Sequence, residues 1–246
     1  GTAKWMNSKG YSTVVVGHDC RFGGEMFLKA ITEIFCFHGI KVLYALDFVS
    51  TPMVSLGVVK LKADLGIVIT ASHNPPSYNG YKLKSHFGGP SSPAEITEVE
   101  NLIPESWDTP TPSFETYVNQ GLASSVPLED MYVNHAEACF DLNLIRKSGL
   151  KIAYDAMYGA GQRAMLRLLP DVLPLHCEYN PSFMGQAPEP IGKNLQELAK
   201  LIQSDDSIAL GIANDGDADR IGMYDGNGKF VDSHHILLLL LLYQYK

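Results

Sequence analysis

Short apolar runs alternate with segments of helical periodicity along this chain, and this alternation is the feature that most restricts its fold. Val14 to Gly17, Lys41 to Ala45 and Leu65 to Thr70 are predicted strands. Glu25 to His38 and Pro52 to Leu61 are predicted helices between them. Runs that are apolar throughout suit strands buried on both faces, so the pattern predicts an α/β fold with helices covering a mixed, largely parallel sheet.

A change of composition suggests that the chain holds two such domains. The stretch from Gly88 to Pro127 is rich in Pro, Ser and Thr, and one helix is expected within it, with a capping box formed by Ser92 and Glu95. We therefore predict a boundary near Val126, which divides the chain into residues 1–126 and 127–246, each a three-layer α/β domain.

A second series of alternating elements follows the boundary. The expected elements are an amphipathic helix from Leu128 to about Leu144, a strand at Lys151 to Tyr154, a helix from Gln162 to Leu169, a helix capped by Asn194 and Glu197 that runs to about Ile202, a strand at Ser207 to Ala213, and a hairpin of Ile221 to Tyr224 with Lys229 to Val231. The apolar run Ile236 to Leu242 is far shorter than the roughly 17–25 residues of a membrane helix. It is predicted to be a buried helix that continues beyond this chain.

Charge and cysteine content narrow the classes of partner. A formal net charge of -8 disfavours a protein that wraps nucleic acid or coats an anionic membrane, because both functions need a field of Lys and Arg. The four cysteines lie far apart without paired spacing, which is typical of reduced thiols in a cytoplasm. We therefore expect a cytoplasmic protein with a small-molecule ligand; the sequence does not restrict its oligomeric state.

Ser72 lies just past the carboxyl end of a predicted strand, where open α/β sheets place their ligand sites. The alternative is an ordinary loop serine that bonds to its own backbone. The pair Asn79-Gly80 is predicted to form a sharp turn with positive φ angles, which would bring Lys82 back towards Ser72. A solvated surface charge is the alternative for Lys82.

Three carboxylates alternate in the loop from Asn214 to Arg220. Asp215, Asp217 and Asp219 can all turn towards one cation, and oxygen ligands of this kind suit Mg²⁺, especially where a phosphate completes the coordination. An EF-hand is excluded because its sixth position, counted from Asp215, is Arg220 rather than Gly. A solvated acidic turn and the nucleophilic loop of an aspartyl-phosphate phosphatase are the alternatives.

Taken together, these segments resemble the α-D-phosphohexomutase family. Thr70 to Pro75, followed by Tyr78 to Lys82, is similar to the phosphoserine loop of that family, and Asp215 to Arg220 is similar to its metal loop. Val14 to Phe22 resembles the family's first strand and the arginine after it, although His18 and Cys20 differ from the residues expected there.

Two shorter segments resemble one branch of the family. Phe87-Gly88-Gly89 and Ala187 to Ile191 look like the phosphoglucomutase and phosphomannomutase branch.

The resemblance implies roles for individual residues. Ser72 would carry the phosphoryl group, and an oxygen of the phosphoserine would join three aspartates in binding one Mg²⁺. The implied metal ligands are Ser72, Asp215, Asp217 and Asp219, and the implied catalytic residues are Ser72, Lys82, Arg21, Arg220 and His73. Lys82 would act as general acid and base or stabilise charge, Arg21 would pair with the phosphoserine, and Arg220 would face the phosphate.

The implied reaction interconverts a hexose 1-phosphate and a hexose 6-phosphate through a hexose 1,6-bisphosphate. Glucose phosphates are the first expectation and mannose phosphates the second, and the glucosamine-specific relatives stay open. Family members have four domains, and this chain resembles the first two, so it is expected to be catalytically incomplete alone. Two other classes stay open, an aspartyl-phosphate phosphatase and a non-catalytic module that binds a sugar phosphate or a metal.

Overall fold

The computed structural model describes residues 1–245, and its contacts divide the chain into two compact units. The first unit comprises Gly1–Thr70 and Asn79–Tyr132, and the second comprises Ala71–Tyr78 and the chain from Val133 onward. The boundary predicted near Val126 lies shortly before this division and stays a prediction. Every helix within residues 1–245 is too short or too polar to cross a lipid bilayer.

The first unit is built on a mixed sheet with the strand order β4-β3-β1-β2-β5. Its strands are β1 (Thr13–His18), β2 (Lys41–Tyr44), β3 (Leu65–Ile69), β4 (Tyr81–Ser85) and β5 (Ala123–Ser125). β4 runs antiparallel to β3, whereas the neighbouring pairs among β1, β2, β3 and β5 are parallel. The predicted mixed, largely parallel sheet is therefore confirmed.

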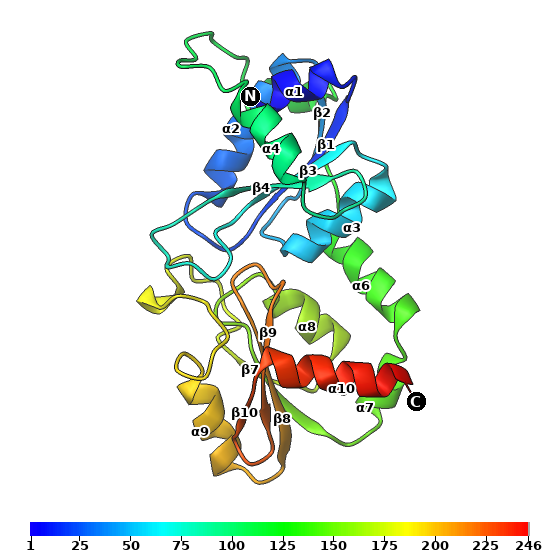
Figure 1. Ribbon diagram of the computed structural model, residues 1–246, viewed down its shortest axis with the longest axis vertical. Helices are drawn as coiled ribbons and strands as arrows, with labels where there is room; N and C mark the ends of the chain where they lie inside the picture. Colours follow the sequence, from blue (N-terminus) through cyan, green and yellow to red (C-terminus); the bar gives the residue numbers. More distant parts are fainter. Residues whose placement is uncertain (246) are drawn as a thin grey trace. The chain divides into compact units, whose positions relative to one another are not determined.

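Helices cover both faces of this sheet (Figure 1). They are α1 (Thr2–Ser8), α2 (Gly24–Phe37), α3 (Thr51–Leu61), α4 (Pro93–Glu100) and α5 (Phe114–Asn119), and α6 (Leu128–Cys139) begins in the first unit. Val14 and Val16 of β1 pack on the side of α2, whereas Val15 lies on the opposite side, near Gly57 of α3. Successive side chains of a strand point to opposite faces, so one apolar strand supplies both layers of contact.

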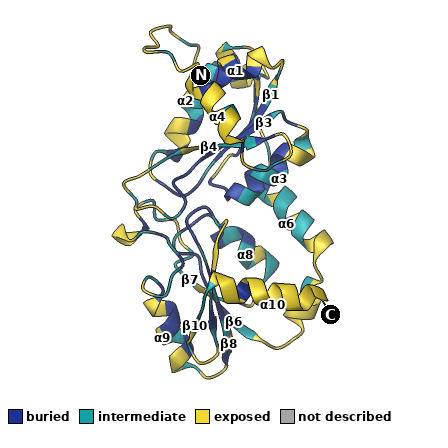
Figure 2. Cartoon of the chain, in the orientation of Figure 1, coloured by how far each residue is buried: buried dark blue, intermediate teal, exposed yellow. Residues whose placement is uncertain are grey.

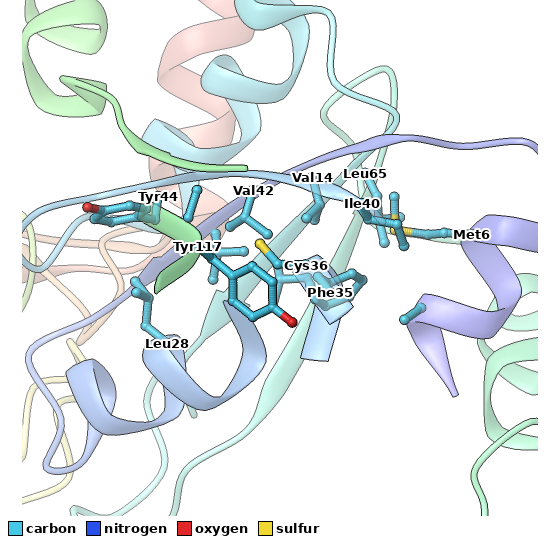
Figure 3. Packing of buried hydrophobic residues seen from close by; sticks show 14 of the residues in the cluster. Met6, Val14, Leu28, Phe35, Cys36, Ile40, Val42, Tyr44, Leu65 and Tyr117 are labelled. Carbon is cyan, nitrogen blue, oxygen red and sulfur yellow. The ribbon is translucent and has the colours of Figure 1, made fainter. Parts of the chain in front are cut away.

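The core of the first unit joins the sheet to α1, α2 and α5. Figure 3 shows Leu28 and Phe35 of α2 packed beside Val14 and Val42 of the sheet, with Tyr117 of α5 against them. All of these side chains are buried. Because a fully buried side chain of this size contributes about 1.5–3 kcal/mol, the cluster is large enough to stabilise this unit.

Local interactions explain where several helices begin and end, and one of them, the capping box of Ser92 and Glu95, was predicted. The side chain of Ser50 caps α3, and Ser92 with Glu95 forms the expected capping box of α4. Gly39 has a φ of 77° just after α2, which is the left-handed conformation that commonly ends a helix.

The second unit contains a mixed sheet with the strand order β10-β9-β8-β6-β7. Its strands are β6 (Lys151–Asp155), β7 (Leu173–Leu175), β8 (Ile208–Asn214), β9 (Ile221–Asp225) and β10 (Phe230–Val231). Its helical segments are α7 (Leu142–Arg146), α8 (Gln162–Leu168), η1 (Phe183–Gly185), α9 (Gln196–Ser204) and α10 (Ser233–Tyr245). α9 and α8 pack against separate clusters from the two faces of the sheet, which confirms a second three-layer α/β domain.

Two predicted helices are wrong in detail. The helix expected from Leu128 to Leu144 breaks after Cys139, because Asp141 caps a new helix by accepting a hydrogen bond from the backbone N–H of Leu144. Asn194 does not cap α9; its side-chain amide instead donates to the carbonyl oxygens of Ala187 and Glu189.

Two further expectations fail near the boundary and at the end of the chain. The segment from Gly88 to Pro127 holds α5 and β5 in addition to the expected helix α4. α10 is not a buried helix: Leu237 to Leu242 are 53% to 62% exposed, and only Ile236 is buried among the helix's described residues (Figure 2). Consecutive leucines point in all directions around a helix, so one neighbouring sheet cannot cover them.

Candidate active site

Ser72 lies in the loop Ala71–Tyr78, here called the serine loop, which groups by its contacts with the second unit. The residue is buried, and its φ of 53° lies in the left-handed region that non-glycine residues rarely adopt. Its hydroxyl donates a hydrogen bond to Oδ2 of Asp215, with an Oγ–Oδ2 distance of 2.8 Å. The serine predicted to carry chemistry and the first predicted metal ligand are therefore direct neighbours.

The aspartate loop, Asn214 to Arg220, leaves the carboxyl end of β8. Asp215 and Asp217 are fully buried, Asp219 is exposed, and one carboxylate oxygen from each lies within 4.8 Å of the others. Oδ1 of Asp215 accepts hydrogen bonds from the backbone N–H groups of Asp219 and Arg220, both at 3.0 Å. Asp215 therefore shapes the loop with one oxygen while its second oxygen faces Ser72.

The electrostatics of this cluster favour a cation. Burial raises the pKa of Asp215 to about 7, the Asp217 carboxylate acts in the same direction, and the hydrogen bond from Ser72 opposes both. A divalent cation would remove this penalty, because it holds the carboxylates in their charged form. Three carboxylate oxygens at this spacing fit Mg²⁺, which prefers hard oxygen ligands and binds through a few carboxylates with further ligands from substrate or water.

His73 belongs to the serine loop, and Arg220 is the last residue of the aspartate loop. The Arg220 guanidinium is half exposed, and its Nε lies 3.9 Å from Oδ2 of Asp215, which is too long for a hydrogen bond. The Nδ1 atom of His73 is buried and makes no hydrogen bond to any of residues 1–245. Both side chains are thus placed in the second unit with Ser72 and the aspartates.

Arg21 belongs to the first unit, where it follows β1. Its side chain is only 2% exposed, and its Nε donates to Oδ2 of Asp19 at 3.2 Å. The same oxygen of Asp19 accepts a hydrogen bond from the Thr70 hydroxyl at 2.6 Å. Asp19, a residue without a predicted role, therefore fixes Arg21 to the end of β3.

Lys82 also belongs to the first unit and lies on β4 opposite Val68 of β3. The sharp turn predicted before it is wrong: neither Asn79 nor Gly80 has a positive φ. The chain reverses over the whole segment from Thr70 to Gly80, and the N–H of Thr70 donates to the Gly80 carbonyl at 3.1 Å. A Cβ on Gly80 would lie 2.7 Å from the backbone carbonyl oxygen of Thr70, so only glycine allows the two backbone segments to lie this close together.

A glycine-rich turn supports the aspartate loop, and the sequence did not reveal this role. The pattern of Gly159-Ala160-Gly161 predicts only a strand-to-helix connection. The N–H of Ala160 donates to the carbonyl of Gly216 at 3.0 Å, and a Cβ on Gly159 would lie 2.7 Å from the backbone carbonyl oxygen of Asp215. The two glycines between β6 and α8 were the available signal, because glycine often marks close backbone approach.

Comparisons with known proteins place the chain in a family. The domain described as "Phosphoglucomutase/phosphomannomutase, alpha/beta/alpha domain I" matches residues 1–108, and "Phosphoglucomutase/phosphomannomutase, alpha/beta/alpha domain II" matches residues 130–228. The fold and these matches define an α/β protein of the α-D-phosphohexomutase class. The chain belongs to the phosphoglucomutase/phosphomannomutase family and comprises its first two domains.

The curated relatives are named for different substrates. A phosphoglucosamine mutase from Leuconostoc mesenteroides is 34% identical over 237 residues, which cover 92% of this chain and 49% of the relative. A phosphopentomutase from Thermococcus kodakarensis is 32% identical, with coverage of 92% and 48%. The chain thus spans about half the length of the relatives it matches.

A solved structure agrees with the fold over nearly the whole chain. A protein from Thermus thermophilus described as a "putative phosphomannomutase" matches with a TM-score of 0.89 and 33% sequence identity, covering 99% of this chain and 55% of that protein. This chain is therefore similar to mutases, which are isomerases, over both of its units.

Proposed function

We propose that this chain forms the phosphoryl-transfer half of a phosphohexomutase, with Ser72 as the residue that carries the phosphoryl group. The observation that carries the proposal is the 2.8 Å hydrogen bond from the Ser72 hydroxyl to Asp215, inside a cluster of three aspartates. A serine phosphate ester is stable between turnovers and reacts when charge on its oxygens is neutralised.

The aspartates and Ser72 would hold one Mg²⁺, which supplies positive charge beside the transferred phosphoryl oxygens when bound. Asp215, Asp217 and Asp219 would supply carboxylate oxygens, and the phosphoserine would supply another oxygen. Arg220 is close enough to the same cluster to add positive charge. The exposed position of its guanidinium suits a group that meets the phosphate of a bound sugar.

In the proposed reaction, a sugar hydroxyl attacks phosphorus while the bond from phosphorus to Ser72 Oγ breaks. The proton of the sugar hydroxyl passes to a base, a role that we assign to Lys82 in its uncharged form, and Lys82 then donates a proton to the Ser72 oxygen that leaves phosphorus. The product is a hexose 1,6-bisphosphate, and transfer of its other phosphoryl group back to Ser72 leaves the isomeric monophosphate. Arg21 and Arg220 would counter the charge that builds on the transferred oxygens.

A hexose phosphate is the proposed substrate, with glucose 1-phosphate and glucose 6-phosphate as the leading pair and mannose phosphates next. The segments Phe87–Gly89 and Ala187–Ile191 support this assignment by resemblance. The identity of 34% to a phosphoglucosamine mutase supports glucosamine phosphates as the alternative substrate class. In either case the same serine and aspartates would carry the phosphoryl transfer.

Mapping the phosphate on the chain tests this proposal. The chain is incubated with Mg²⁺ and glucose 1,6-bisphosphate, and intact mass and phosphopeptide analysis then locate any phosphate, with Ser72→Ala as the matched control. A phosphate on Ser72 that resists hydroxylamine is expected. A hydroxylamine-labile acyl phosphate on an aspartate would indicate an aspartyl-phosphate phosphatase, and no covalent phosphate would indicate a binding module.

A further inference from the structure

The aspartate loop rests on the turn Ala156–Ala160, which joins β6 to α8. The N–H of Ala160 donates to the Gly216 carbonyl at 3.0 Å. A Cβ on Gly159 would lie 2.7 Å from the carbonyl oxygen of Asp215 and 3.0 Å from the Cα of Gly216. The two backbones are therefore in direct contact, and a displaced turn would displace the residues that carry the proposed metal ligands.

This turn adopts a conformation that its sequence does not favour. Met157 and Tyr158 have φ angles of 48° and 59°, so two consecutive non-glycine residues lie in the left-handed region. Such residues persist only where surrounding contacts hold them, and they are concentrated at functional sites. The contacts that hold Met157 and Tyr158 therefore determine where the aspartate loop lies.

Asp155 and His176 provide those contacts. Oδ1 of Asp155 accepts the N–H of Met157 at 2.8 Å, and the His176 carbonyl accepts the N–H of Tyr158 at 2.9 Å. The His176 ring then joins the two, because its Nδ1 lies 2.9 Å from the same oxygen of Asp155.

Burial and charge make this link between Asp155 and His176 specific. Asp155 is only 1% exposed, so its carboxylate needs the partners it has. The other ring nitrogen of His176, Nε2, lies 3.2 Å from Oε2 of Glu197. The hydrogen bond to Asp155 raises the pKa of His176, which is consistent with a ring that donates to both carboxylates.

We propose that Asp155 and His176 are positioning residues of the aspartate loop: they hold the strained turn Ala156–Ala160, and the turn holds the backbone at Asp215 and Gly216. This inference rests on the proposed function, in which the loop binds Mg²⁺. Groups beyond the direct ligands of a metal typically change its affinity about 10–100-fold when removed. Because Asp155 and His176 act through a backbone segment, the lower end of that range is expected.

The test measures Mn²⁺ binding by the full chain, with Mn²⁺ in place of Mg²⁺ because its free form is counted by electron paramagnetic resonance. His176→Ala removes the ring, whereas His176→Asn keeps a donor near Nδ1 and tolerates the φ of 46° at this position. His234→Ala is the matched control, since His234 is exposed at the start of α10. Should His176→Ala fail to fold, Asp155→Asn replaces it.

His176→Ala is expected to weaken Mn²⁺ binding about tenfold, whereas His176→Asn stays within about twofold of the unmodified chain and His234→Ala leaves binding unchanged. Metal-free hydrogen exchange at the amides of Ala160, Asp219 and Arg220 should become faster in His176→Ala only. Unchanged affinity and exchange in folded His176→Ala would overturn the proposal, as would equal losses in the alanine and asparagine variants.

A different result would show that the proposed metal site is wrong. Asp217→Asn removes one of the three carboxylates and should weaken Mn²⁺ binding. If the unmodified chain binds no Mn²⁺, the metal assignment is wrong. The exchange measurement needs no metal, so it still tests whether His176 positions the aspartate loop.

Discussion

Gly216 of the aspartate loop lies close to the backbone of the serine loop, and replacing it with alanine should separate the two loops. A Cβ at this position would lie 2.6 Å from the backbone oxygen of Ser72 and 2.9 Å from Cγ of Pro188. Close carbon–oxygen contacts in proteins are about 3.3 Å or longer, so one backbone must move by roughly 0.7 Å. Because a backbone oxygen cannot rotate away as a flexible side chain can, the shift must come from a loop.

The consequence can be estimated from the hydrogen bond between the loops. Ser72 Oγ and Asp215 Oδ2 are 2.8 Å apart, and a displacement of roughly 0.7 Å along that line would stretch this hydrogen bond to the outer limit of its range and weaken it. Forcing an extra methyl group into close packing costs about 1–3 kcal/mol. Gly216→Ala should therefore lower the free energy of unfolding by about that amount and also weaken Mn²⁺ binding.

Gly192→Ala is the matched control in the same unit. Its added Cβ would lie 3.7 Å from Cγ of Phe230 and 3.7 Å from the hydroxyl of Tyr224, which are ordinary contacts. Urea unfolding of both variants gives the comparison, and Gly192→Ala should be neutral or slightly stabilising. Equal free energies of unfolding and equal Mn²⁺ affinities for the two variants would refute the argument that Gly216 sets the distance between the loops.

The remaining predictions concern four residues of the site and its support. Lys82→Ala should lower turnover of the full-length enzyme far more than it lowers the melting temperature, and equal losses would return Lys82 to a structural role. Asp217→Asn should stabilise the metal-free chain at neutral pH, because it removes a negative charge beside Asp215, but it should weaken Mn²⁺ binding. Calorimetry should therefore show a higher melting temperature for the metal-free variant and a smaller increase of that temperature on adding Mn²⁺. NMR titration should show that the pKa of the His176 ring is higher than that of a free histidine. Because the pKa is raised in the folded state, the stability that the ring contributes is complete below the unfolded-state pKa of about 6.5 and is lost as the pH rises through the folded-state pKa. Ser72→Gly should be more stable than Ser72→Ala by about 1 kcal/mol, because only glycine adopts a φ of 53° without strain, and equal urea midpoints would contradict this.

Much of the fold follows from patterns that act over a few residues. The continuous apolar runs at Val14–Gly17 and Leu65–Thr70 have one compatible environment, a strand covered on both faces, and they became β1 and β3. Capping by Ser92 and Glu95 is equally local, and it appears as predicted. These elements could be predicted because the signal for each lies within the segment itself.

Errors arose where a distant contact or a competing local bond decided the structure. Asn194 had the residue type of a helix cap, but its amide found two carbonyl oxygens in the segment before it. Asn79-Gly80 had the residue types of a tight turn, but the glycine is needed because the Thr70 oxygen lies so close. Propensity describes what a residue can do alone, and tertiary contacts select among those options.

Some residues of the candidate site could be predicted from the sequence, and others could not. Ser72 and the alternating aspartates could be singled out from the sequence, since each follows a predicted strand and has side chains suited to phosphoryl chemistry. The support given by Asp155 and His176 could not, because these residues are 21 positions apart and meet only when β6 and β7 pair. Residues that position a site are set by strand order, which a single sequence does not reveal.

Backbone strain gives one further reason to connect the serine loop with the aspartate loop. Ser72 and Ala218 both have a φ of 53°, one in each loop, although glycine would avoid the cost of about 1–3 kcal/mol at either position. In the aspartate loop, the bonds from the N–H groups of Asp219 and Arg220 to Asp215 hold the conformation around Ala218. In the serine loop, the strained backbone directs a hydroxyl towards Asp215, and glycine has no hydroxyl to direct. Glycine at position 72 would relieve this strain but would lose the oxygen that the proposed phosphoryl transfer needs.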